Sequence, residues 1–304
     1  MPIQYAITHS TVYRYSSPVT FGEHRVMFRP RDSHDLRVLA TDLQVSPDAV
    51  VRMIQDPHSN SVALVTPLGE ATELRIDCSF TIEHAHTHNL ALPLAPSALF
   101  FPFAYSVAER FDLEHYLRPH YDDPEGILTH WARRFISTSG PTGTRELLVQ
   151  MNQHIRDNFT YSTREEEGTQ TPVETLQLAG GTCRDFALLM MEAARRLGIA
   201  SRFVSGYLYD PALDDDADGD GLPATTVGAG STHAWLQTYL PGAGWVPFDP
   251  TNNLLGGNQL IRVGVARDPA QAAPISGSWY GPADAYLGME ATVLVRRVGR
   301  GRAG

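Results

Sequence analysis

Cys183, His233 and Asp249 are the side chains of this sequence that could together support nucleophilic chemistry. A cysteine attacks a carbonyl carbon as its thiolate, which requires a base close to the thiol and a third group that orients the base. Histidine suits the role of base, and aspartate suits the role of orienting group. The surrounding elements must therefore bring these three residues together.

The segment LAGGTCRDFALLMMEAARRLGIASRFVSGYL places Cys183 at the start of a predicted helix. A Gly180-Gly181 turn precedes it, and an apolar stripe at helical spacing follows until Gly198 ends the helix. The stripe comprises Phe186, Leu189, Met190, Ala193 and Leu197. The helix dipole and the free N–H groups at this end stabilise an anion, and one N–H group could face an oxyanion. For the cysteine taken alone, packing beneath the turn is the alternative.

The segment STHAWLQTYLPGAGWVPFDPTNN predicts a β-hairpin with its turn after Leu240. If Leu240 pairs with Gly244, then Asp249 lies opposite Trp235. Because side chains alternate between the two faces of a strand, His233, Trp235 and Asp249 then share a face. His233 and Asp249 become diagonal neighbours within reach of each other.

A carboxylate at Asp249 would hold the imidazole of His233 in one tautomer and one orientation. The other ring nitrogen could then take the thiol proton and later protonate a leaving amine. Taken singly, His233 could be a structural histidine, and Asp249, which precedes Pro250, could be a turn former. Trp235 is predicted to bind substrate by lining the cleft, with ordinary core packing as its alternative.

Other polar residues near the nucleophile have weaker assignments. Asp185 lies in the first helical turn, where it would complement the helix dipole without a catalytic role. Gln170 and Tyr161 lie upstream and are polar candidates for a second oxyanion donor. We do not include these two residues among the predicted catalytic residues.

The run GGTCRDFALLMMEAARRLGIASRFVSGY, with STHAWLQTYLPGAGWVPFDPTN after it, resembles the core of transglutaminase-like proteins. These proteins are papain-like thiol enzymes with a Cys, His, Asp triad. The resemblance extends from Thr171 to Asn253 and implies Cys183 as nucleophile, His233 as base and Asp249 as orienting group. The family includes transglutaminases, thiol proteases, peptide amidases and members without catalysis. The resemblance therefore implies a mechanism more than a substrate.

The pattern of residues at the front of the chain predicts a separate, β-rich fold. Short β-rich runs alternate with turn residues: YAITHSTVYRY, LRVLATDLQVSP, SVALVTP and ELRIDCSFTIE. YAITHSTVYRYSSPV, FRPRDSH and DPHSNSVALV also resemble the β-rich N-terminal region of bacterial family members. Together the two resemblances imply one family architecture for the entire chain, which the terminal strand EATVLVRRV would complete.

We expect an α+β protein in two parts. Residues 1–105 would form an antiparallel β-sandwich-like domain. Residues 106–304 would form a transglutaminase-like, papain-like domain in which an antiparallel sheet packs on the cysteine-bearing helix. The stretch LALPLAPSALFFPF, whose prolines break helices and central strands, is expected to be an ordered linker between them.

Composition limits the classes of partner. The 304 residues are 42% hydrophobic and 19% charged, which is typical of globular proteins. With 34 acidic and 24 basic residues the net charge is −10, so nucleic acid and anionic membranes are not expected partners. The first residues, MPIQYAITHS, have no basic segment followed by an apolar run. We expect a soluble, cytoplasmic protein.

Three further patterns in the sequence bear on metal or disulfide sites. The two cysteines, Cys78 and Cys183, do not predict a disulfide or a thiolate zinc site, and Cys78 is expected to be a buried strand residue. The acidic run from Asp214 to Asp220 resembles a calcium loop, but Val227 stands where an EF-hand needs glutamate. His84, His86 and His88 could share a strand face, for which an exposed polar surface is the simpler interpretation. No metal or cofactor is predicted.

The sequence thus favours a thiol enzyme that acts on peptide or isopeptide amide bonds of a protein or peptide substrate through a thioester. Water would resolve the thioester in a cysteine peptidase or amidase. In the alternative, a lysine amine would resolve it, as in a protein-glutamine crosslinking transglutaminase. A third hypothesis, from another class, is a catalytically silent protein-binding module.

Overall fold

The front of the chain forms two antiparallel sheets that face each other, here named the β-unit. The computed structural model describes residues 2–85, 93–163, 168–213, 227, 230–256 and 259–300, without the side chains of residues 299 and 300. The first sheet has the order β17-β1-β6-β3, and β18 also pairs with β1. Its strands are β1 (Ile3–Phe21), β3 (Leu36–Ser46), β6 (Glu70–His84), β17 (Trp279–Tyr280) and β18 (Tyr286–Arg300).

The second sheet of the β-unit has the order β16-β2-β5-β4. Its strands are β2 (His24–Val26), β4 (Ala49–Gln55), β5 (Ser61–Pro67) and β16 (Ile275–Ser276). One hydrophobic core joins both sheets, with Ile7 and Ile76 from the first and Val26 and Val65 from the second. The predicted antiparallel β-sandwich-like N-terminal fold is thereby confirmed.

Strand β6 shows why the sequence folds this way. Alternate residues from Leu74 to His84 are buried, while those between them are partly exposed. This period of two lets a strand cover a core with one face and keep the polar face toward solvent. Cys78 is one of the buried residues, with 3% of its surface exposed.

The last strands of the chain return to the β-unit. β18 pairs with β1 in antiparallel register from Ile3↔Arg300 to Tyr15↔Tyr286, and β16 pairs with β2. The expected division at residues 105 and 106 assigned these strands to the catalytic part. The sheet pairing instead places residues 275–300 with residues 3–84, because β1 needs a hydrogen-bonding partner on the side opposite β6.

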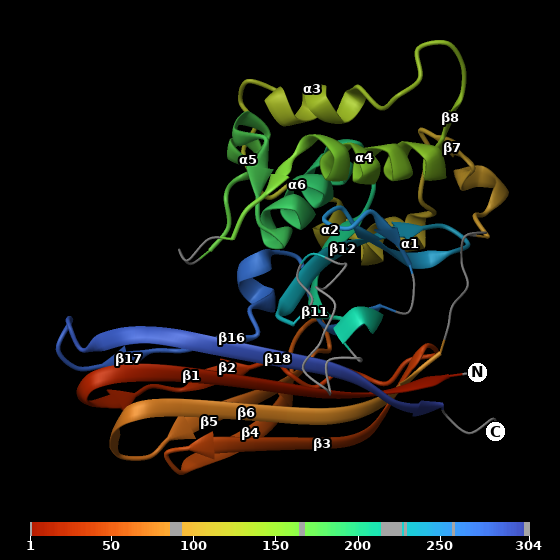
Figure 1. Ribbon diagram of the computed structural model, residues 1–304. Helices are drawn as coiled ribbons and strands as arrows, with labels where there is room; N and C mark the ends of the chain where they lie inside the picture. Colours follow the sequence, from red (N-terminus) through yellow and green to blue (C-terminus); the bar gives the residue numbers. More distant parts are fainter. Residues whose placement is uncertain are drawn as a thin grey trace.

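The middle of the chain forms an antiparallel sheet with helices packed on it, here named the core. The sheet has the order β14-β13-β12-β11-β15. Its strands are β11 (Ser201–Leu208), β12 (Thr232–Leu240), β13 (Gly244–Asp249), β14 (Leu254–Leu255) and β15 (Leu260–Ala266). Figure 1 shows this sheet between the helices on one side and the long strands of the β-unit on the other.

The helices vary widely in length. They are α1 (Val107–Asp112), α2 (Glu114–Leu117), α3 (Ile127–Arg133), α4 (Thr144–Asn158), α5 (Pro172–Leu178) and α6 (Cys183–Arg196), with short 3-10 turns η1 (Pro96–Ala98), η2 (Pro211–Leu213) and η4 (Pro269–Ala272). Two short strand pairs join them, β7 (Phe100–Phe101) with β8 (Thr142–Gly143) and β9 (Thr160–Tyr161) with β10 (Gly180–Gly181). Across the described residues, every helix falls short of the length or apolar character that a membrane span requires.

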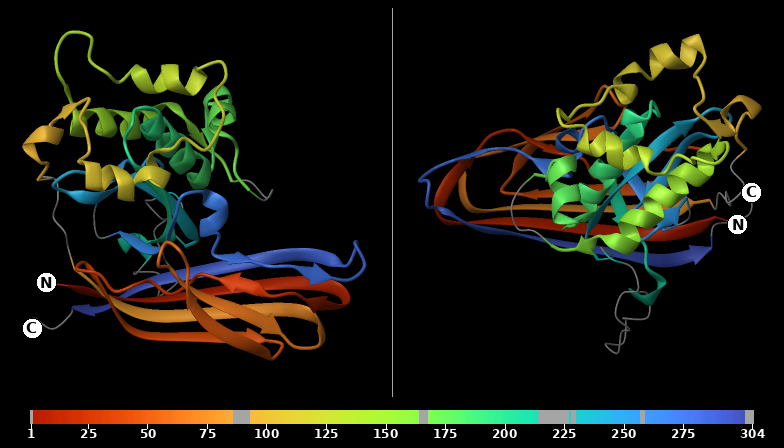
Figure 2. Two further views of the ribbon diagram at one scale, coloured as in Figure 1. Left: turned by 180° about the vertical axis from the view of Figure 1, so that it is seen from behind. Right: turned by 90° about the horizontal axis from the view of Figure 1, so that it is seen from above.

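Helix α6 is buried on almost all sides. The sequence predicts one apolar stripe, but every residue from Asp185 to Arg195 is buried. The sheet covers one side, and α3, α4 and α5 lie on the other (Figure 2). The predicted end of the helix is confirmed, because Gly198 has φ of +77° and its N–H group donates to the carbonyl of Arg195.

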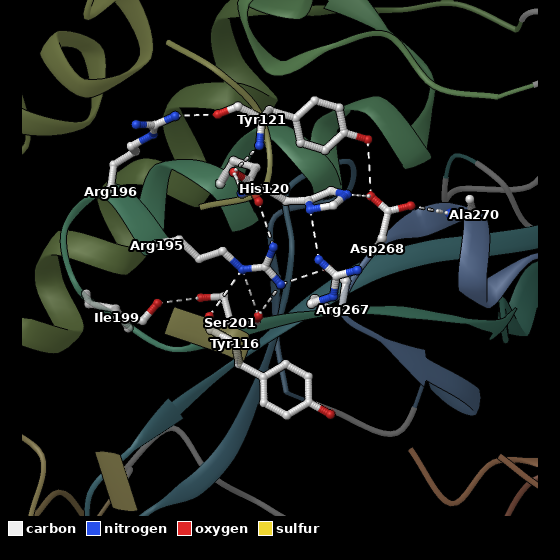
Figure 3. A network of polar contacts seen from close by, with 11 residues as sticks. Tyr116, His120, Tyr121, Arg195, Arg196, Ile199, Ser201, Arg267, Asp268 and Ala270 are labelled. Atoms are coloured by element: carbon white, nitrogen blue, oxygen red, sulfur yellow. Dashed lines mark hydrogen bonds and ion pairs between the residues drawn. The ribbon is translucent and has the colours of Figure 1, made fainter. Parts of the chain in front are cut away.

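A buried ion pair on α6 binds the surrounding segments together (Figure 3). Glu192 and Arg195 are joined by a contact of 2.6 Å, and both side chains are fully buried. Arg195 also donates to three backbone carbonyls, those of Tyr116, Ser201 and Arg267. Since Ser201 begins β11, the pair fixes the C-terminal half of α6 against the sheet.

The core sheet also packs against the β-unit. Tyr207 of β11 and Ile261 of β15 belong to the same buried cluster as β1 and β6. The Tyr207 hydroxyl lies 2.9 Å from Nδ1 of His9 in β1. The long strands of the β-unit extend beyond the core on one side, as the view from above in Figure 2 shows.

Candidate active site

Cys183 is the first residue of α6, as the sequence predicts. Thr182 is the N-cap residue, and its hydroxyl accepts a hydrogen bond from the N–H group of Asp185 at 3.4 Å. The Asp185 carboxylate accepts in return from the N–H group of Thr182 at 2.8 Å and from that of Gln170 at 2.7 Å. Asp185 therefore organises the turn that presents Cys183, which agrees with the structural role expected for it.

The thiol of Cys183 is largely shielded, with 7% of the residue exposed. The Gly180-Gly181 segment before it pairs in parallel with Thr160–Tyr161. As the first helical residue, Cys183 has no intrahelical acceptor for its N–H group. This end of α6 can therefore offer a backbone donor beside the sulfur atom.

The hairpin has the predicted register. Leu240 pairs with Gly244, and the pairing continues to Leu236 and Phe248. The next step along the two strands brings Trp235 opposite Asp249, so His233 and Asp249 are diagonal neighbours. Nε2 of His233 lies 2.9 Å from Oδ2 of Asp249, and both side chains are fully buried.

The ring of His233 uses its two nitrogens differently. With Nε2–H donating to Asp249, the neutral imidazole has its lone pair on Nδ1. Nδ1 is buried and makes no hydrogen bond of ordinary geometry to a described group. Cys183 nevertheless acts on the ring, since its polar contact and its charge both help to raise the pKa of His233. Nδ1 is therefore the nitrogen available to the thiol.

Burial and charge oppose each other in this pair. Burial alone would lower the pKa of His233, but the charge of Asp249 and the hydrogen bond to it, with the contribution of Cys183, raise it to about 10. Burial alone would raise the pKa of Asp249, but His233 and two further donors hold it below its ordinary value. The pair is therefore favoured as imidazolium and carboxylate.

The two further donors to Asp249 were not identified from the sequence. The N–H group of Thr251 donates to Oδ1 at 2.9 Å, and Nδ2 of Asn252 donates to Oδ2 at 3.0 Å. Asn252 also bonds to the backbone N–H and carbonyl of Val227. The run Asp-Pro-Thr-Asn at residues 249–252 is the signal that could have identified them. In such runs an aspartate side chain often accepts a hydrogen bond from the backbone N–H group two residues later.

Trp235 is packed tightly beside His233. Only 1% of it is exposed, and its ring stacks on the imidazole with centroids 6.1 Å apart and planes at 25°. A Cβ atom at Gly206, which pairs with His233, would come within 2.8 Å of the indole. Gly206 thus leaves the space that Trp235 fills, and Trp235 limits how the imidazole can tilt. A role for Trp235 in substrate binding stays a prediction.

Tyr161 and Gln170 differ in their relation to Cys183. Burial, together with the charges of Cys183, Asp185 and Asp249, raises the pKa of Tyr161 to about 12, so its hydroxyl stays protonated near the thiol. The side-chain oxygen of Gln170 accepts a hydrogen bond from the Thr175 hydroxyl at 3.1 Å. Tyr161 is therefore the better placed of the two as a polar neighbour of the nucleophile.

Two of the other candidates from the sequence, Cys78 and His84, lie in β6 of the β-unit. Cys78 is buried within β6, where burial and nearby carboxylates raise the pKa of its thiol to about 12. His84 is buried at the end of the same strand. His86, His88 and the acidic run from Asp214 to Asp220 lie outside the described residues.

Comparison with known families agrees with both parts of the chain. The transglutaminase-like superfamily matches residues 129–250, which include Cys183, His233 and Asp249. The bacterial transglutaminase-like N-terminal region matches residues 5–83, which lie within the β-unit.

Known proteins resemble the chain over almost its whole length. An uncharacterized protein of Mycobacterium tuberculosis is 30% identical over 91% of this chain and 88% of its own. An uncharacterized protein of Mycobacterium leprae is 27% identical over 90% and 92%. A crystal structure from Cytophaga hutchinsonii, described as a candidate cysteine protease, has the same fold, with a TM-score of 0.70, 19% identity and coverage of 97% and 91%. The chain belongs to the transglutaminase-like superfamily.

Proposed function

We propose that the chain is a thiol enzyme that hydrolyses amide bonds in a peptide or protein. Cys183 is the nucleophile, His233 the base and acid, and Asp249 the group that orients His233. The observation that supports this most is the fully buried contact of 2.9 Å between Nε2 of His233 and Oδ2 of Asp249, which leaves Nδ1 for the thiol. The cysteine protease description of the C. hutchinsonii protein is in line with this proposal.

The first half of the reaction forms a thioester. In the resting enzyme the thiol proton already resides on Nδ1 of the His233 imidazolium, in line with the raised pKa of this ring, and the Cys183 thiolate adds to the carbonyl carbon of the amide. The carbonyl oxygen becomes an oxyanion, which the backbone N–H group of Cys183 can stabilise. When the C–N bond breaks, Nδ1–H of His233 gives its proton to the departing nitrogen, which leaves as an amine. An acyl group remains on the sulfur atom.

The second half releases the acyl group and restores the nucleophile. His233 removes a proton from water at Nδ1, and the hydroxide formed adds to the thioester carbonyl. The C–S bond then breaks, the product leaves as a carboxylic acid, and the Cys183 thiolate is restored beside the His233 imidazolium. Asp249 stays ionised throughout, since its contribution is to hold Nε2–H and to stabilise the imidazolium.

The first test is the rate of iodoacetamide alkylation of Cys183 as a function of pH. A free thiol reacts slowly well below pH 8.5, because little of it is thiolate. We expect Cys183 to react rapidly down to about pH 6, and we expect His233→Ala to abolish this low-pH reactivity. Cys78 serves as the internal control, because its rate should be the same in both proteins. A Cys183 profile like that of a free thiol in both proteins would reject the proposal.

The second test separates hydrolysis from amine transfer. Peptides containing glutamine are incubated with the enzyme, with and without a fluorescent primary amine, and products are identified by mass spectrometry. Cleaved peptides or glutamate from glutamine, absent with Cys183→Ala, would support hydrolysis. Amine incorporation as the dominant product would instead make the enzyme a transglutaminase.

A further inference from the structure

A cavity of about 340 Å³ lies between the core sheet and the β-unit. Its volume is within the range of about 300–1,000 Å³ that is common for small-molecule sites. The segment from Arg31 to Leu36 lines one side, and parts of β12 and β13 line another. Neither Cys183 nor His233 nor Asp249 is among the described residues that line it. This cavity is therefore separate from the candidate active site.

The cavity is strongly cationic in a protein whose net charge is −10. Four arginines line it, Arg31, Arg145, Arg202 and Arg262, and Asp35 is the one acidic side chain among the described lining residues. Asp35 lies 3.8 Å from Arg262. In the described part of the chain, Arg31, Arg145 and Arg202 have no ion-pair partner. The positive charges thus exceed the negative charge by three.

Three of these arginines lie close enough to repel one another. Burial and the charges of Arg262 and Arg31 lower the pKa of Arg202 to about 9, against a favourable contact with Tyr116. Burial also lowers the pKa of Arg262. The charge of Asp35 opposes this lowering, and the charge of Arg31 adds to it. Arg202 and Arg262 are partly buried, whereas Arg31 is exposed. Such a cluster of cations gains stability when an anion enters, because the anion replaces hydration that burial removed and relieves the repulsion.

Two of the guanidinium groups are held in place. Nε of Arg202 donates to Oε1 of Gln237 at 2.9 Å, and its guanidinium lies over the Trp245 ring at 4.0 Å from the centroid. Arg262 donates to the Ser33 hydroxyl at 3.2 Å. Guanidinium groups held in this way bind carboxylate or phosphate oxygens with little loss of side-chain freedom.

We propose that this cavity binds a small anion with two or more negative charges, carried by carboxylate or phosphate groups, through Arg31, Arg202 and Arg262. The proposal is independent of the amidase function, because the cavity contains none of the three proposed catalytic residues. Trp235 nevertheless lines the cavity and stacks on His233, so the two sites share a wall.

Isothermal titration calorimetry at constant ionic strength tests this proposal with two probes, citrate and pyrophosphate. We expect one saturable site for at least one probe. Binding of citrate alone would identify a carboxylate ligand, and binding of pyrophosphate alone a phosphate ligand. Both Arg202→Gln and Arg31→Gln should weaken binding about tenfold or more, since each removes hydrogen bonds to a charged group. Arg31 is exposed, so its replacement leaves the packing intact.

Two control variants accompany these measurements. Arg133→Gln removes an exposed arginine of α3 outside the cavity and should leave affinity within about twofold, as expected when ionic strength is held constant. Cys183→Ala should also bind normally, even if the amidase proposal fails. The anion-site proposal is overturned if neither probe binds at up to about 10 mM, or if Arg133→Gln weakens binding as much as the two cavity variants.

Discussion

At the contact between His233 and Asp249, burial and charge shift the pKa of each group in opposite directions. Each group would be unstable as an ion in the interior if it stood alone. Together they form an ion pair of 2.9 Å, and Thr251 and Asn252 supply two more hydrogen bonds to the carboxylate. The free energy of unfolding therefore depends on the protonation states of both residues.

We predict that the free energy of unfolding depends on pH through this pair. The folded pKa of His233 is about 10, above the ordinary 6.5, so its contribution is complete below pH 6.5 and is lost as pH rises toward 10. The folded pKa of Asp249 is lowered, so its contribution is present above about pH 4 and is lost as pH falls further. Urea unfolding of wild type and His233→Gln should show their difference in stability shrinking between pH 6.5 and 10.

His9 provides a matched control, because its contribution to stability changes with pH in the opposite direction. Burial lowers its pKa to about 4, so its contribution to stability is present above pH 6.5 and is lost as pH falls toward 4. The stability difference between wild type and His9→Gln should therefore be constant above pH 6.5. If the His233→Gln difference is equally constant there, His233 is not held as an imidazolium.

At the scale of elements, α6 is positioned from both of its ends. The capping box of Thr182 and Asp185 fixes the N-terminal turn that presents Cys183. The pair of Glu192 and Arg195 fixes the other half against β11 and the segment before α3 (Figure 3). A helix buried on nearly all sides needs such contacts, because its polar groups cannot reach water.

Two of the three capping boxes among the described helices allow a controlled test. Thr171 caps α5 with the same geometry with which Thr182 caps α6. Thr171→Ala and Thr182→Ala should each lower the free energy of unfolding by about 1 kcal/mol in urea unfolding. Only Thr182→Ala should also slow alkylation of Cys183, because only this cap orients the N–H groups beside the thiol. Equal alkylation rates in the two variants would contradict a role of the cap in reactivity.

Glu192→Gln should destabilise the fold much more than loss of a surface ion pair. It leaves the fully buried Arg195 without its counter-charge, which typically costs about 3–5 kcal/mol. Glu290→Gln is the control, since its partner Arg14 is about half exposed, and it should cost less than about 1 kcal/mol. Guanidinium unfolding of both variants measures the two costs, and similar small values would show that the buried pair adds little.

At the scale of the whole molecule, the chain leaves the β-unit after residue 85, forms the core, and returns at residue 275. β1 lies between β6 and β18, so the first strand is not fully paired until the last strand is in place. The β-unit therefore depends on the end of the chain, although its family match covers only residues 5–83.

Removal of β18 tests this dependence. A chain that ends at Ala285 leaves most of β1 as an unpaired edge and exposes Ile7 and other residues that β18 helps to cover, so we expect aggregation and loss of cooperative unfolding. Addition of a synthetic peptide of residues 286–300 should partly restore solubility. Unfolding of the shortened chain at the same denaturant midpoint as the full chain would show that β18 is dispensable.

Local patterns in the sequence determined which elements form and which face each side chain takes. The Gly-Gly turn and apolar spacing placed Cys183 at the start of α6, and strand parity placed His233 beside Asp249, because both depend on residues close in the sequence. Such patterns specify which face of a helix or strand a side chain occupies, but they do not specify which segment of the chain packs against that face. Only the tertiary structure decided that β18 returns to β1, that α6 is buried on almost all sides, and that Arg31, Arg202 and Arg262 line one cavity, since these arrangements join segments far apart in the chain.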